Sequence, residues 1–310
     1  MKKRKLRIFP VISLIVFVIV VVYACIIIKD VFKKDVEDNT NTPDTEVSLP
    51  DNTTENVTPD NDSNEDPDDT PQTSVEIPEE DKTEFKSDAP KPLYTHAELL
   101  ELFDDTILDK SEDAGQEYID DMIFIGDSTT HGMAYYGVLK GGKNTNQVWT
   151  PKSGTLAMWN LLTENIVYPE DDSEMSIADA IHLKTPKTVV LTLGVNGVSS
   201  LSEENFKKYY NDLVKIIKEK SPETNIILQS IYPVCDYYEV KSISMEKINR
   251  ANVWIAEIAK ENEVYYLNTI SALVGENGYL INDYCNGDGI HISKAGFEVI
   301  LDYIRTHAID

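Results

Sequence analysis

The last two-thirds of the chain alternates short apolar runs with longer segments of helical periodicity, and this alternation restricts the folds open to it. Four runs lack charged residues and end at glycine or polar residues; they span 122–125, 188–193, 226–228 and 264–267. Continuous apolar runs of this length are typical of strands that are buried on both faces. The sequence therefore predicts a mostly parallel sheet covered by helices on both faces, a three-layer α/β/α sandwich.

Capping residues and apolar spacing place helices between these runs. Ser202 precedes a segment with apolar residues at three- and four-residue steps, and similar patterns span about 245–262 and the residues after Ser293. A capping box that opens at Thr95 predicts a further helix to about Leu108. In sheets of this kind, functional sites lie beyond the carboxyl ends of the strands.

Two short motifs supply residues suited to nucleophilic catalysis. Ser128 follows the first apolar run, where strand turns to helix, and Asp288 and His291 lie three residues apart before the last helix. A serine hydroxyl needs a base to take its proton as it attacks, and an imidazole works best when a carboxylate fixes its tautomer. The sequence thus predicts a triad of nucleophile Ser128, base His291 and acid Asp288.

Each motif also has a purely structural interpretation. Asp127 and Ser128 are residue types that cap helices, and 288–291 fits a surface turn before a capped helix. His131 is a rival base close to Ser128. It is expected to point away or sideways from a helix that starts near Ser128, and no acid lies at triad spacing from it.

The stretch from Phe124 to Gly132 resembles the first signature of the SGNH/GDSL esterase/hydrolase superfamily, and 288–291 resembles its last. The segment 194–197 is similar to the third signature, with Gly197 in place of the usual acid. The resemblance implies a flavodoxin-like serine carboxylic-ester hydrolase whose oxyanion hole consists of the Ser128 amide, the Gly154 amide and the Asn196 side chain. Gly154 is the candidate because Ser153-Gly154-Thr155 follows Ser128 at a suitable distance. The chain has no His-Glu-x-x-His motif and no clustered Cys/His set, so no metal and no other cofactor is expected.

The first 92 residues differ from the rest in composition. Residues 1–7 are basic, and 8–28 are apolar apart from Pro10 and Ser13, long enough at ~1.5 Å per residue to cross a ~30 Å bilayer core. The basic cluster predicts a single-pass anchor with a cytoplasmic N-terminus and an extracellular catalytic domain; a cleaved signal peptide is the alternative. Together with this anchor, the resemblance implies a membrane-anchored extracellular enzyme of bacterial type. Residues 29–92 are acidic and rich in Thr, Asn and Pro, which predicts a disordered linker. The hydrolase domain is then 93–310.

This arrangement suggests an esterase acting on O-acetyl groups of cell-wall or extracellular glycans, or on small esters. The net charge of −26 comes from both the linker and the hydrolase domain, and no Lys/Arg-rich face indicates nucleic acid. A glycan O-acyltransferase with the same triad and a non-catalytic wall-binding module remain alternatives. Whether Cys235 and Cys285 form a disulfide also stays open. Six aromatic residues are candidates for stacking on sugar rings: Tyr135, Tyr136, Trp149, Trp159, Tyr237 and Tyr238.

Overall fold

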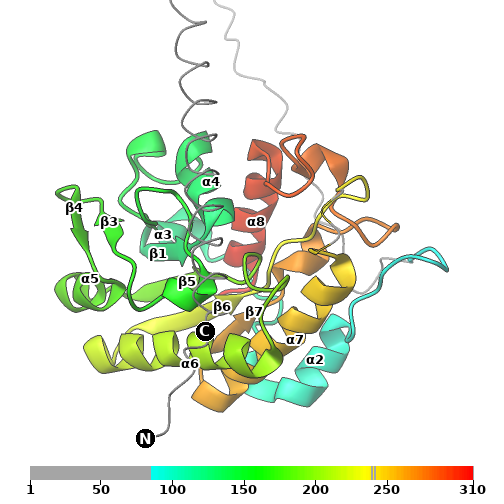
Figure 1. Ribbon diagram of the computed structural model, residues 1–310, viewed down its shortest axis with the longest axis horizontal. Helices are drawn as coiled ribbons and strands as arrows, with labels where there is room; N and C mark the ends of the chain where they lie inside the picture. Colours follow the sequence, from blue (N-terminus) through cyan, green and yellow to red (C-terminus); the bar gives the residue numbers. More distant parts are fainter. Residues whose placement is uncertain (1–84, 239, 241, 310) are drawn as a thin grey trace, which may run out of the picture. The chain divides into compact units, whose positions relative to one another are not determined.

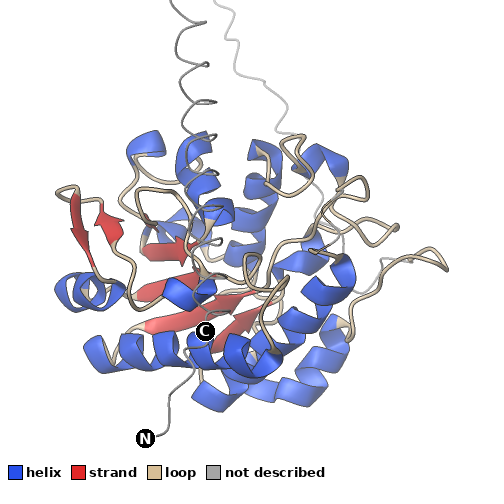
Figure 2. Cartoon of the chain, in the orientation of Figure 1, coloured by secondary structure: helices blue, strands red, loops and turns tan. Residues whose placement is uncertain are grey.

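The computed structural model describes residues 85–238, 240 and 242–309, and a five-stranded sheet forms the centre of this region (Figure 2). Every neighbouring pair of strands is parallel, in the order β2-β1-β5-β6-β7. The predicted parallel α/β sheet is therefore confirmed. Its strands are β1 (Met122–Gly126), β2 (Val148–Trp149), β5 (Thr188–Thr192), β6 (Asn225–Gln229) and β7 (Tyr265–Leu267).

Side chains that alternate across the strands build two separate cores, one on each face of the sheet. Ile125 and Leu191 face a core shared with α2, α5, α6 and α7, whereas Phe124 and Val190 face one shared with α3, α4 and α8. The sheet is thus the middle of three layers, with α4 and α8 on one side and α6 and α7 on the other (Figure 1). The helices are α2 (His96–Phe103), α3 (Gly115–Asp120), α4 (Ser128–Tyr136), α5 (Ile177–Lys184), α6 (Glu203–Lys220), α7 (Met245–Asn262) and α8 (Lys294–Thr306).

The first described helix, α2, ends earlier than predicted. It stops at Phe103, and Asp104 takes a positive φ of 51° before a short 3₁₀ turn. Ile107 then pairs with Tyr266 in a parallel bridge beside β7. Leu102, in the last turn of α2, is 47% exposed. Pairing with the sheet edge therefore overrides the helical spacing of the apolar residues.

Three short strands carry too little sequence signal to be predicted. The two residues of β2 extend the sheet beside β1, and β3 (Ile166–Tyr168) pairs with β4 (Ser173–Met175) in an antiparallel hairpin outside the main sheet. Periodicity needs more residues than these strands contain.

The predicted anchor at 8–28 and most of the predicted linker lie outside the described residues and stay predictions. Within 85–238, 240 and 242–309, no helix combines the length and the apolar character needed to cross a membrane. The described end of the predicted linker, 85–92, packs on the domain: the Lys86 N–H donates to the Glu276 carbonyl at 2.9 Å, and Asn249 Nδ2 donates to the Lys91 carbonyl at 2.8 Å. The folded region therefore begins before residue 93.

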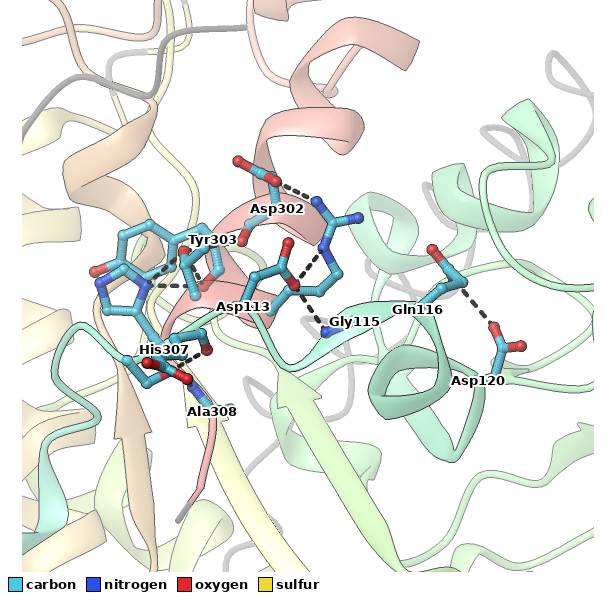
Figure 3. A network of polar contacts seen from close by, with 12 residues as sticks. Asp113, Gly115, Gln116, Asp120, Asp302, Tyr303, His307 and Ala308 are labelled. Atoms are coloured by element: carbon cyan, nitrogen blue, oxygen red, sulfur yellow. Dashed lines mark hydrogen bonds and ion pairs between the residues drawn. The ribbon is translucent and has the colours of Figure 1, made fainter. Parts of the chain in front are cut away.

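Polar contacts fix the end of α8, the helix that follows the predicted acid–base turn (Figure 3). Arg305 pairs with Asp302 on its own helix and with Asp113 before α3, at 3.2 Å from Nε to Oδ1. His307 stacks on Tyr303 with ring centroids 3.8 Å apart, and burial lowers the pKa of His307 to about 4. These contacts hold α8 against the rest of its layer.

Gly126 ends β1 in a space that admits no side chain. A Cβ added there would lie 2.0 Å from Thr130 Oγ1 in α4 and 2.4 Å from the Thr192 carbonyl in β5. Gly126 and Thr192 are also register partners in the sheet. The bare backbone of Gly126 therefore lets α4 begin directly against the ends of two neighbouring strands.

We expect Gly126→Ala to lower the free energy of unfolding by about 3 kcal/mol, because the added methyl overlaps backbone as well as side-chain atoms. Urea denaturation of the purified protein measures this change. Gly275→Ala is the matched control: its nearest neighbour would be 3.4 Å away, and its effect should stay within about 1 kcal/mol. Equal denaturation midpoints for Gly126→Ala and the wild type would contradict the role of this close approach.

Candidate active site

Ser128 is the first residue of α4, directly after the turn that leaves β1. Asp127 caps the helix: its carboxylate accepts hydrogen bonds from the Thr129 N–H at 3.0 Å and from Thr129 Oγ1 at 2.7 Å. The amide of Ser128 belongs to the first turn, where helical N–H groups lack intrahelical partners and favour negative charge. The Ser128 hydroxyl and amide are therefore both at the carboxyl edge of the sheet.

The structural interpretation of this motif, that its residues cap a helix, is correct for Asp127, which is the N-cap of α4. This side chain is fully buried, and burial raises its pKa from 3.8 to about 6, although hydrogen bonds from Thr129 and the charge of His291 act in the opposite direction. The Asp127 carboxylate accepts hydrogen bonds inside the turn, whereas the Ser128 hydroxyl faces outward from the helix start.

In the structure, Ser128, His291 and Asp288 are joined by two consecutive polar contacts through the His291 ring. Ser128 Oγ lies 2.9 Å from His291 Nε2, across 163 positions of sequence. On the other side of the ring, His291 Nδ1 lies 2.6 Å from Asp288 Oδ2. Three predicted site residues from two distant motifs thus meet at one place.

Close packing of α4 on α8 sets the distance between these two motifs. A Cβ added at Gly132 would lie 2.8 Å from the ring of Phe297, which is completely buried. Glycine at this position therefore lets α8 approach α4 one turn after Ser128, which holds the turn before α8 over the start of α4.

Hydrogen bonds keep the Asp288 carboxylate ionised. Partial burial raises the pKa of Asp288, but the amides of His291 and Ile290, each 2.9 Å from Oδ1, and the His291 ring outweigh it and lower the pKa from 3.8 to about 2. An ionised carboxylate accepts the proton of Nδ1. The other ring nitrogen, Nε2, is then the one able to accept a proton from the Ser128 hydroxyl.

The two further oxyanion candidates lie together at the loop 151–156. Asn196 Nδ2 donates to Thr155 Oγ1 at 3.0 Å and to the Leu156 carbonyl at 3.1 Å. The Gly154 N–H donates to the Pro151 carbonyl at 2.8 Å. Both predicted donors therefore have acceptors inside the protein in this structure, and their role at an oxyanion stays a prediction.

His131, the rival base, lies on the first turn of α4 and lines the same pocket as Ser128. Its Nδ1 is 3.2 Å from Thr150 Oγ1, and its ring lies 3.3 Å from the position of a Cβ added at Gly154. Its ring nitrogen thus meets a hydroxyl rather than a carboxylate. The Thr150 contact carried no signal in the sequence, because it joins α4 to the end of the unpredicted strand β2.

A pocket of about 490 Å³ opens in front of the Ser128–His291 contact. Tyr135 at its rim is 64% exposed, with Lys143 Nζ 5.4 Å from its ring centroid. Trp149, a predicted candidate for sugar stacking, is only 1% exposed and packs against Tyr168, so that interpretation is wrong for Trp149. The pocket is lined by Ser128, Thr129, His131, Gly132, Tyr135, Tyr136, Asn286, His291, Ile292 and Phe297.

Metal-ligating residue types do not gather in the described part of the chain: no group of three or more His, Cys, Asp or Glu side chains is arranged to hold an ion there. Cys235 and Cys285 are free thiols.

Comparison with known proteins identifies a family. The model of the GDSL-like lipase/acylhydrolase family matches residues 124–299. No curated protein sequence matches the chain.

Several solved structures resemble this one at low identity. A Streptococcus pneumonia protein named for platelet activating factor is 19% identical, with 67% of this chain and 88% of that chain covered and a TM-score of 0.46. A GDSL-like lipase from Bacteroides thetaiotaomicron is 18% identical, with 61% and 87% covered and a TM-score of 0.42. The periplasmic domain of a lipopolysaccharide acetyltransferase from Salmonella ser. Paratyphi A is 20% identical, with 60% and 82% covered and a TM-score of 0.41.

Proposed function

The chain belongs to the GDSL-like lipase/acylhydrolase family, within the SGNH/GDSL superfamily, and we propose that it is a serine esterase with Ser128 as nucleophile, His291 as general base and Asp288 as orienting acid. The observation that carries the proposal is the 2.9 Å contact of Ser128 Oγ with His291 Nε2, continued at 2.6 Å from Nδ1 to Asp288. The family match includes all three residues.

The reaction proceeds in two acyl-transfer steps. Ser128 Oγ attacks the acyl carbon of the ester while His291 Nε2 takes the hydroxyl proton, and Asp288 stabilises the imidazolium that forms. His291 returns this proton to the leaving alkoxide, which departs as an alcohol and leaves an acyl group on Ser128. A water molecule, deprotonated by His291, then attacks the acyl carbon, and the carboxylic acid leaves as Ser128 regains its proton. Asp288 is exposed and His291 half-buried, so water reaches the base; this favours hydrolysis over acyl transfer to a sugar.

The nucleophile and the base are tested with p-nitrophenyl acetate and purified full-length protein. Ser128→Ala and His291→Ala should each lower the hydrolysis rate at least about 10³-fold, because each removes a group on which the same proton transfer depends.

Matched controls are Ser200→Ala and His182→Ala, which change exposed residues outside the pocket and should hydrolyse the ester at the wild-type rate. Wild-type activity in Ser128→Ala would reject the nucleophile. Loss of activity in His131→Ala together with retention in His291→Ala would transfer the role of base to His131.

The oxyanion of each tetrahedral intermediate is held by the Ser128 amide, the Gly154 amide and the Asn196 side chain. The helix start supports the role of the first donor. For the other two, the present acceptors are the Pro151 and Leu156 carbonyls and the Thr155 hydroxyl, all neutral groups. An oxyanion is a stronger acceptor than these, so it can compete for the same donors as charge develops.

Asn196→Ala should lower kcat by about 10²–10³-fold, because one oxyanion donor is lost, while KM changes little. Steady-state kinetics with p-nitrophenyl acetate and thermal unfolding by circular dichroism measure both effects. Asn146→Ala, which changes an exposed asparagine, is the control. If Asn196→Ala lowers only the unfolding temperature and leaves kcat intact, Asn196 merely ties down the loop 151–156.

The substrate class is an O-acetylated glycan of the cell wall or extracellular matrix. The pocket supports this, since its rim carries the exposed ring of Tyr135 beside Tyr136, and sugar rings present apolar faces that stack on such rings. The sequence prediction of a membrane anchor at 8–28, with the catalytic domain outside the cell, is consistent with such a polymer as substrate.

Tyr135→Ala should lower kcat/KM for an O-acetylated oligosaccharide about ten-fold and leave the hydrolysis of p-nitrophenyl acetate unchanged, because the small ester does not reach the rim. Release of acetate measures the first rate. Tyr94→Ala removes an exposed tyrosine outside this pocket and is the control. Equal losses of kcat/KM on both substrates would show that Tyr135 maintains the structure of the site and does not recognise the glycan.

A further inference from the structure

Two buried cysteines both contact Gly289, in the turn that carries Asp288 and His291. Cys235 is 1% exposed in the loop after β6, and Cys285 is 9% exposed immediately before this turn. Both belong to the same core cluster, and both are free thiols. Between them lies Gly289, and the ring of Tyr237 packs there: a Cβ added at Gly289 would lie 3.3 Å from Tyr237 Cε2.

Gly289 connects the two cysteines through its backbone. Its N–H donates to Cys285 Sγ at 3.2 Å, and its carbonyl accepts the Cys235 N–H at 2.8 Å. A second amide, that of Gly287, also donates to Cys285 Sγ at 3.5 Å. The sulfur of Cys285 therefore accepts two hydrogen bonds from the backbone of the turn and stabilises its conformation.

The base of the same turn is closed by backbone pairing. Cys285 forms an antiparallel bridge with Ile292, and the Asn286 N–H donates to the His291 carbonyl at 2.9 Å. Any covalent bond to Cys285 consequently acts on the closed segment that positions the proposed base and acid.

The surroundings distinguish the two thiols. For Cys285, burial raises the pKa, but the Tyr237 hydroxyl, the Gly287 and Gly289 amides and the Cys235 thiol outweigh it and lower the pKa. For Cys235, burial raises the pKa to about 11. Since the thiolate is the nucleophile in thiol–disulfide exchange, Cys285 reacts first.

We propose that Cys235 and Cys285 form an intramolecular disulfide when the protein meets a small-molecule disulfide, and that this bond ties the turn at 286–291 to the loop after β6. The Cys285 thiolate attacks one sulfur of the small disulfide, whose other sulfur leaves as a thiolate. Cys235 loses its proton and its sulfur attacks Cys285 Sγ, which expels the second small thiolate. Both small thiolates take up the protons that the cysteines lost, so two cysteine thiols are oxidised and one disulfide is reduced to two thiols.

The experiment uses full-length protein with Cys25→Ser, so that only Cys235 and Cys285 carry thiols. After equilibration with glutathione disulfide, thiols are titrated under denaturing conditions and the intact mass is measured. We expect no free thiol, a mass lower by two hydrogens and no glutathione adduct, with two thiols restored by reductant. Persistent thiols, a stable glutathione adduct or a disulfide between two chains would overturn the proposal.

Single variants test the order of reaction. In Cys235→Ser the remaining Cys285 should form a mixed disulfide with glutathione at least ten-fold faster than the remaining Cys235 does in Cys285→Ser. Tyr237→Phe, which removes a hydroxyl that lowers the pKa of Cys285 and leaves both cysteines, should slow disulfide formation without changing its final extent. Equal rates for the two single cysteines would contradict the assignment of Cys285 as the attacking thiol.

Thermal unfolding tests the tie between the two loops. The oxidised protein should unfold at a temperature higher than the reduced protein by on the order of 5 °C, and Cys235→Ser should lose this difference. An unchanged or lower unfolding temperature would contradict the proposal that the disulfide ties these two loops together. None of these readouts measures ester hydrolysis, so failure of the proposed esterase function would leave them interpretable.

Discussion

The hydrogen bond between Ser128 Oγ and His291 Nε2 joins the end of the first strand to a turn near the end of the chain, and the chemistry of the site depends on it. Two close approaches make the contact possible. Gly126 lets α4 start against β5, and Gly132 lets α8 pack on α4 through Phe297. The site is thus held by rigid elements on both sides, since α4 and α8 belong to the same packed layer.

Two carboxylates in the site, Asp127 and Asp288, have pKa values shifted in opposite directions because their surroundings differ. Asp127 is fully buried, which raises its pKa, and it is used to cap α4 through Thr129. Asp288 is exposed and receives hydrogen bonds from two amides and the His291 ring, which hold its pKa low. One acid therefore stabilises the helix that presents the nucleophile, while the other fixes the tautomer of the proposed base.

The sheet order explains why several loops converge here. The chain runs from β1 to β2 on one side and returns to β5 on the other side of β1, so the connections after β1 and β5 diverge at the carboxyl edge of the sheet. Such a switch point leaves a crevice. Ser128 follows β1, Thr150 and Gly154 follow β2, and Asn196 follows β5. The turn before α8 adds Asp288 and His291.

The sequence by itself determined the features that depend on neighbours along the chain: the four main strands, the long helices with their serine caps, and the candidates Ser128, Asp288 and His291. It could not determine the early end of α2, the burial of Trp149, the contact of His131 with Thr150, or the contacts of Cys235 and Cys285 with Gly289. Only the tertiary structure decided these, because each depends on which distant segments pack together. Apolar runs and helix caps act over a few residues, whereas such packing joins positions far apart in the chain.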